Sequence, residues 1–137
     1  MGSFTHYFPA IARILMGLIF FVFGLNGFLH IIRPPKTPMP EGATAFIVAL
    51  MKTAYLFQLI MGTQLIVGIL LLVNIFVPLA LALVAPIIVG IITFHIFFEP
   101  AGLPMASIVF VLEIYLAWAD RQAFRAMLAM RTIPGDQ

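Results

Sequence analysis

The sequence predicts an all-α integral membrane protein: a bundle of four transmembrane helices with a short re-entrant or interfacial helix after the first span. Hydrophobic residues make up 64% of the 137-residue chain and charged residues only 9%, whereas an ordinary soluble domain is about 45–50% apolar and about 25% charged. The apolar residues form four stretches, each long enough to cross a bilayer. Turn-forming or polar residues separate these stretches. We expect one domain over residues 1–137.

The first half of the chain contains two spans and a short apolar segment between them. We expect the first span at about residues 10–29 and the second at about residues 55–73. Four prolines between residues 34 and 40 exclude a regular helix there, because each proline lacks a backbone donor and has a fixed φ. Residues 42–53 are apolar but too short to span, which predicts the re-entrant or interfacial helix.

The second half contains the other two spans and a surface helix. Asn74 predicts a tight turn, after which we expect the third span at about residues 76–98, with a kink at Pro86. Pro100 and Gly102 lie in the next turn, and the fourth span follows at about residues 103–119. Residues 120–131 gather apolar side chains on one helical face, which is typical of a helix at the membrane surface.

The charged residues give the expected orientation and exclude several function classes. Four spans place both termini on one side, and that side has one more Lys or Arg than the other, which favours cytoplasmic termini. We also expect a bacterial inner (cytoplasmic) membrane protein. The net charge is only +2 and forms no basic run, so we expect no nucleic-acid partner. The chain has no cysteine, which excludes a Cys-x-x-Cys redox relay and a thiolate metal site.

Polar residues within the spans are the candidate ligand-binding residues, because an ionisable side chain in hydrocarbon costs roughly 2.5–3.5 kcal/mol and usually has a partner or a function. The candidates are Asn26, His30, Gln58, Gln64, His95, Glu99 and Glu113. His30 and His95 fall at the same leaflet because the spans alternate in direction. Gln64 and Glu113 reach roughly 14–15 Å into a ~30 Å core.

Together these positions predict a funnel between the helices. Its mouth would hold His30, Gln58, His95 and Glu99, and its floor Asn26, Gln64 and Glu113. Each residue also has a structural interpretation. The histidines and Glu99 would then face headgroups, and the two floor amides would link helices. Glu113 would be a structural residue, a protonated acid or a hydrogen-bond partner of Gln64.

A quinone fits these side chains better than a metal or haem does. A quinone head group needs donors for two carbonyl oxygens and a route for protons on reduction, which His and Glu supply. A haem has only the two histidines to support it, and no Cys-x-x-Cys-His attachment motif is present, so we do not expect one. Zinc requires three or four ligands, and we expect no metal. No catalytic residue can be assigned.

The ordered set of segments resembles the DoxX family of small four-helix membrane proteins. The first span carries this likeness in residues 12–20 (ARILMGLIF) and 23–28 (FGLNGF), and the second in residues 64–68 (QLIVG). The third and fourth spans carry it in residues 85–90 (APIIVG), 94–95 (FH) and 112–118 (LEIYLAW). The likeness covers nearly the whole chain. Many relatives carry glutamate where this chain has Gln64, so the resemblance implies no acid role at this position.

The resemblance implies a redox-associated membrane protein, since some relatives form part of thiosulfate:quinone oxidoreductase. We therefore expect a quinone-like apolar ligand within the bundle, and either a homo-oligomer or a subunit of a redox complex in the lipid bilayer. Two alternatives stay open. In the first alternative, the chain is a non-catalytic anchor that docks a partner enzyme through residues 33–40 or 121–131. In the second, it is a small-solute or proton carrier that uses Glu113.

Overall fold

The computed structural model describes residues 2–30 and 39–129. Six α-helices and one short 3-10 helix, η1, follow in order: α1 (Gly2–Leu29), α2 (Glu41–Lys52), α3 (Leu56–Val73), α4 (Val77–Phe97), η1 (Pro100–Gly102), α5 (Leu103–Ala119) and α6 (Arg121–Met127). The described residues contain no strand. Four helical segments are long and apolar enough to cross a membrane: Tyr7–Leu29, Leu56–Val73, Val77–Phe97 and Pro100–Ala119. The prediction of an all-α, four-span membrane bundle is confirmed.

The helix ends differ from the expected ones at both termini. Helix α1 begins at Gly2, before the expected start of the first span, because apolar composition marks where a chain enters hydrocarbon and not where its helix begins. Helix α6 ends at Met127, whereas the surface helix was expected to reach residue 131. Most of the proline-rich segment and the last two residues of that expected helix lie outside the described residues.

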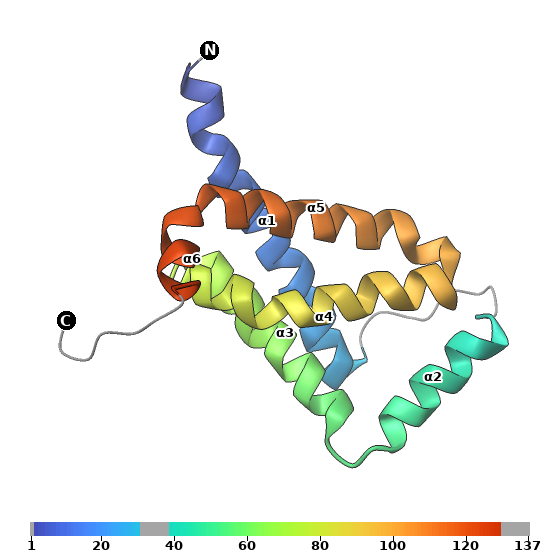
Figure 1. Ribbon diagram of the computed structural model, residues 1–137. Helices are drawn as coiled ribbons and strands as arrows, with labels where there is room; N and C mark the ends of the chain where they lie inside the picture. The colour runs from blue at the N-terminus through green and yellow to red at the C-terminus, as the bar shows by residue number, and fades with distance from the viewer. Residues whose placement is uncertain (1, 31–38, 130–137) are drawn as a thin grey trace.

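The four spans form two antiparallel pairs that cross each other (Figure 1). Helix α1 packs along α3, and α4 packs along α5. The buried apolar core joins the two pairs mainly in the half of the bundle nearest α6; it includes Met16 and Phe20 of α1, Leu71 of α3, Leu81 and Val84 of α4, and Leu116 of α5. The other half, nearest α2, contains few fully buried side chains. The pairs therefore hold together at one end and leave internal space at the other.

Glycines allow the backbones of α1 and α3 to approach closely. A Cβ atom at Gly24 would lie 2.6 Å from the backbone nitrogen of Leu65, and one at Gly68 would overlap the backbone of Phe21. Only a residue without a side chain fits at either position. Lipid tails are as apolar as leucine, so helices in a membrane associate through close packing of this kind and not through hydrophobic burial.

The C-terminal end of α3 is closed by its own turn and by an arginine of α1. Asn74 adopts a left-handed conformation with a φ of 61°, and the N–H of Ile75 donates to the carbonyl of Leu70 at 3.0 Å. The Arg13 guanidinium donates to the carbonyls of Leu71 and Leu72. These carbonyls have no partner inside the helix. They lie at the negative end of the helix dipole, where a cation is favourable.

Helix α2 lies across the open side of the bundle, between the beginning of α3 and the end of α4 (Figure 1). The Phe46 ring packs on those of Phe94 and Phe98, with centroids 5.3 and 5.7 Å apart. Ala43 is fully buried. This position agrees with the predicted short helix after the first span. Helix α2 thus covers the half of the bundle in which the two helix pairs have separated.

Large apolar side chains cover the outside of all four spans. Examples are Ile11 and Leu15 of α1, Ile66 of α3, Val89 of α4 and Val111 of α5, each of which is exposed. Such a surface is stable only against hydrocarbon, because soluble monomers rarely expose continuous apolar patches larger than a few hundred Å². The protein is therefore an integral membrane protein in contact with lipid.

Replacing Gly24 with Ala should separate α1 from α3. Moving the Leu65 backbone away from the added methyl group should lower the free energy of unfolding by about 1–3 kcal/mol. SDS titration of the detergent-solubilised protein, followed by circular dichroism, measures this change. Gly90→Ala is the matched control, since a Cβ there meets no atom within 4 Å. Equal effects of the two variants would show that the close approach contributes nothing.

Replacing Arg13 with Met should destabilise the end of α3. The methionine keeps most of the apolar stem but removes the charged hydrogen bonds to Leu71 and Leu72, which are worth about 1.5–3 kcal/mol in total. The same SDS titration checks the loss. Arg125→Met is the control, because Arg125 is exposed on α6. A stability equal to that of the control would contradict a structural role for Arg13.

Candidate functional site

A cavity of about 330 Å³ lies between α1, α3, α4 and α5 in the separated half of the bundle. We call it the polar-walled cavity. Its polar lining residues are Asn26, His30, Gln64 and His95, and its apolar lining includes Phe20, Phe23, Phe57, Met61, Ile91 and Met105. The volume falls in the range of about 300–1,000 Å³ that small-molecule sites occupy. An apolar cavity with a few convergent polar groups is the usual form of such a site.

Gln64 is the most deeply placed polar residue of this cavity. It lies in the middle of α3, is only 5% exposed, and its carboxamide forms no hydrogen bond within the described part of the chain. The carboxamide has two N–H groups and one carbonyl oxygen, so it can donate to a ligand in the cavity. Gln64 is therefore the strongest indication that the cavity binds a ligand with a polar group.

His95 is held in one orientation at the end of α4. Its Nδ1 lies 3.1 Å from the carbonyl oxygen of Glu99, and since a carbonyl only accepts, Nδ1 carries the proton. The Glu99 carboxylate lies 3.9 Å from the same nitrogen. Gly102 leaves room for the imidazole, because a Cβ there would overlap the ring. Nε2 is thus the ring nitrogen that remains for a ligand.

Asn26 and His30 bring the end of α1 to the same cavity. His30 adopts a left-handed conformation with a φ of 52°, and its N–H donates to the Asn26 carbonyl at 2.8 Å. Histidine is among the few non-glycine residues that adopt this conformation with any frequency. The turn ends the helix, and the exposed His30 side chain stands at the edge of the cavity while Asn26 lies one turn deeper.

The structure does not place the other three candidates on this cavity wall. Gln58 is exposed on another face of α3. Glu99 reaches the site only through its contacts with His95. Glu113 lies one turn beyond the lining residue Val109, and its buried Oε2 has no hydrogen-bond partner among the described residues. Of the three structural interpretations of Glu113, the hydrogen bond to Gln64 is not found in this part of the chain.

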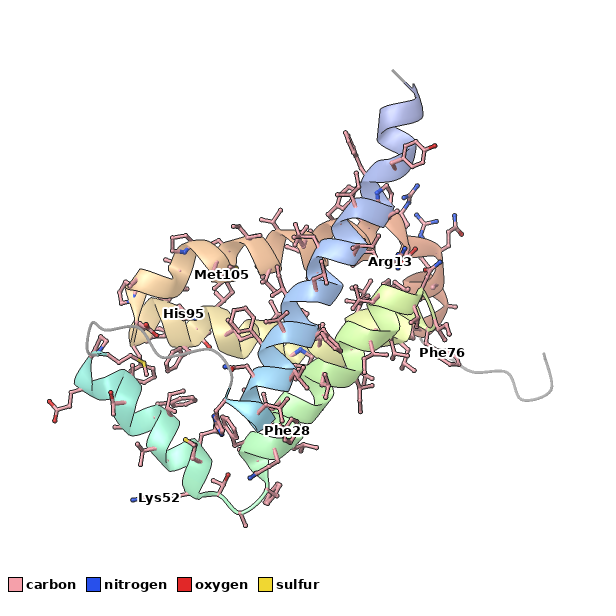
Figure 2. All side chains as sticks on the ribbon, turned by 180° about the vertical axis from the view of Figure 1, so that it is seen from behind. Arg13, Phe28, Lys52, Phe76, His95 and Met105 are labelled. Carbon is pink, nitrogen blue, oxygen red and sulfur yellow. The ribbon has the colours of Figure 1, made fainter. Side chains whose placement is uncertain are left out.

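The predicted funnel is thus a four-residue site with a different arrangement. Asn26, His30, Gln64 and His95 share one cavity, and His95 and Arg13 lie toward opposite ends of the bundle (Figure 2). The sequence does not reveal which apolar residues line the polar-walled cavity, for example Met61 and Met105. These residues resemble every other apolar residue of the spans, and only the rotation of each helix distinguishes them.

Comparisons with protein-family models, with curated proteins and with solved structures found no match. The resemblance to the DoxX family therefore stays a prediction that rests on the order of the sequence segments.

Replacing Gly102 with Ala should displace the His95 ring and weaken its hydrogen bond to the Glu99 carbonyl. The neutral ring would then lose its preference for the proton on Nδ1. Nitrogen chemical shifts of labelled histidine, recorded at a pH at which the ring is neutral, report this tautomer. Gly62→Ala is the control, because a Cβ at Gly62 meets only Phe28 at 3.8 Å. An unchanged tautomer in the Gly102 variant would contradict the assigned geometry.

Proposed function

We propose that this chain is a redox-associated integral membrane protein of the DoxX type that binds a quinone-like ligand in the polar-walled cavity. One observation carries the proposal: Gln64, a polar residue that is only 5% exposed, lines an apolar cavity that also contains the oriented ring of His95. A ligand that suits this wall has an apolar body and carbonyl oxygens that accept hydrogen bonds.

The chemistry of a quinone matches the donors on this wall. Its two carbonyl oxygens accept hydrogen bonds, and the Gln64 carboxamide supplies two N–H groups. Reduction to a quinol adds two electrons and places one proton on each oxygen. With its proton on Nδ1, the His95 ring presents Nε2 as an acceptor for a quinol hydroxyl, and His30 lies on the same wall. The electrons would come from a partner enzyme, which makes this chain a quinone-binding subunit or anchor.

A second candidate function is that of a membrane anchor without a ligand of its own. Helix α6 favours it, because this helix is short and most of its residues are exposed, among them Arg121 and Arg125. An exposed basic helix beside the membrane suits an acidic surface on a soluble enzyme. Replacing both arginines should then weaken that association.

Replacing Gln64 with Leu should lower the affinity for a quinone. We expect a loss of about tenfold, which corresponds to about 1.4 kcal/mol, in the range of a single hydrogen bond. The measurement is the quinone that co-purifies in mild detergent, by organic extraction and mass spectrometry, followed by titration of the quinone-free protein. Gln58→Leu is the matched control, since it makes the same replacement on the same helix outside the cavity.

Three results would contradict the proposal. Wild-type protein that binds no quinone would exclude the function, and equal affinities of the two glutamine variants would exclude the site. A Soret band in the absorption spectrum of the purified protein would show that the bound ligand is haem and not a quinone. Loss of binding in the Gln64 variant alone, with folding unchanged, is the expected result.

A further inference from the structure

A second cavity, of about 410 Å³, lies under α2 and between α3 and α4. We call it the apolar cavity. It is lined by Phe46, Ile47 and Leu50 of α2, Ile60 of α3, and Ile87 and Gly90 of α4, among others. Among the described residues, the polar side chains that line it are those of Gln64 and His95. A site of this composition suits hydrocarbon, because apolar cavities take up apolar molecules.

The apolar cavity and the polar-walled cavity adjoin each other. Four residues line both of them: Met61 and Gln64 of α3, and Ile91 and His95 of α4. The two spaces therefore meet at these four residues, which include the two polar groups assigned to the quinone head. Met61 is one of the four, and its unbranched side chain adapts readily to a neighbour.

The apolar cavity also opens toward the surrounding hydrocarbon. Pro86 and Gly90 line it and are both exposed on α4. A Cβ at Gly90 would meet no atom within 4 Å, so the wall has free space at this point. A hydrocarbon chain from the bilayer can therefore enter beside Gly90 and reach Gln64 and His95, which line both cavities.

We infer that the ligand has two parts, a polar head in the polar-walled cavity and a long isoprenoid or alkyl tail in the apolar cavity beneath α2. This inference rests on the proposed quinone function and specifies the class of quinone, one with a membrane-length tail. The shared wall of Met61, Gln64, Ile91 and His95 carries it. The role of α2 follows: its Phe46, Ile47 and Leu50 form the outer wall for the tail.

The test compares two quinones with the same fully substituted ring, one with a long isoprenoid tail and one with a methyl group in its place. Gly90→Phe should fill the apolar cavity without adding bulk to the polar-walled cavity, which Gly90 does not line. Val89→Phe is the matched control, because Val89 is exposed next to it and lines neither cavity. Gly90→Leu is a smaller second variant for the case in which phenylalanine prevents folding.

Binding is measured in the same lipid nanodiscs for all proteins. Wild-type and Val89→Phe proteins should bind the tailed quinone at least tenfold more tightly than the methyl analogue, after correction for partition into lipid. Gly90→Phe or Gly90→Leu should abolish this preference and leave the affinity for the methyl analogue within twofold of wild type.

The remaining outcomes separate the two proposals. Equal affinities of the wild-type protein for both quinones, or a preference that survives in both Gly90 variants, would overturn the tail site and leave the proposed function standing. Binding of neither quinone to the wild-type protein would overturn the proposed function, and the tail site with it.

Discussion

The close approach of α1 to α3 sets the geometry of the whole bundle. Within a membrane, neighbouring helices gain nothing from the removal of water, so association relies on dense packing and on polar contacts between helices. Gly24 and Gly68 bring the two backbones together where any side chain would collide. Arg13 adds a polar link at one end, from α1 to the free carbonyls of α3. This pair is the rigid unit against which the other helices are placed.

The second pair meets this unit over only part of its length. The buried core between the pairs includes Phe20, Leu71, Leu81 and Leu116, mostly in the half nearest α6. In the half nearest α2 the pairs separate, and two cavities occupy the space. Helix α2 packs over one of them through Phe46. The fold thus concentrates its stability at one end of the membrane-spanning region and its candidate binding site at the other.

The candidate site lies in the half of the bundle nearest α2. Gln64 and His95 line both cavities there, and most of the other lining residues are apolar. Gln64 has no partner among the described residues, whereas His95 is oriented by Glu99 and given room by Gly102. One residue therefore contributes an unmet hydrogen-bonding capacity and the other a defined ring orientation. A ligand carbonyl oxygen would accept from the Gln64 N–H groups, and a ligand hydroxyl would donate to His95 Nε2.

The sequence alone determined the class of fold. Lipid requires every backbone polar group to be satisfied inside the protein, by helices or by a closed barrel, and four apolar stretches of about 20 residues have the length of spanning helices and not of strands. A polar asparagine between two apolar stretches also predicted the turn at Asn74, and the left-handed conformation of that residue confirms it. The sequence also selected the polar residues worth considering, because such residues are few and costly within a span.

Only the tertiary structure decided which of these residues meet. Gln58 and Gln64 have the same side chain on the same helix, yet one is exposed and the other is buried in the wall of a cavity. The spans are apolar on all sides, so their patterns do not reveal which face of each helix is turned inward. That rotation is set by the contact of Gly24 with Leu65 and by the packing of α4 and α5 on the first pair. Contacts between distant segments carry this information, and no single span contains it.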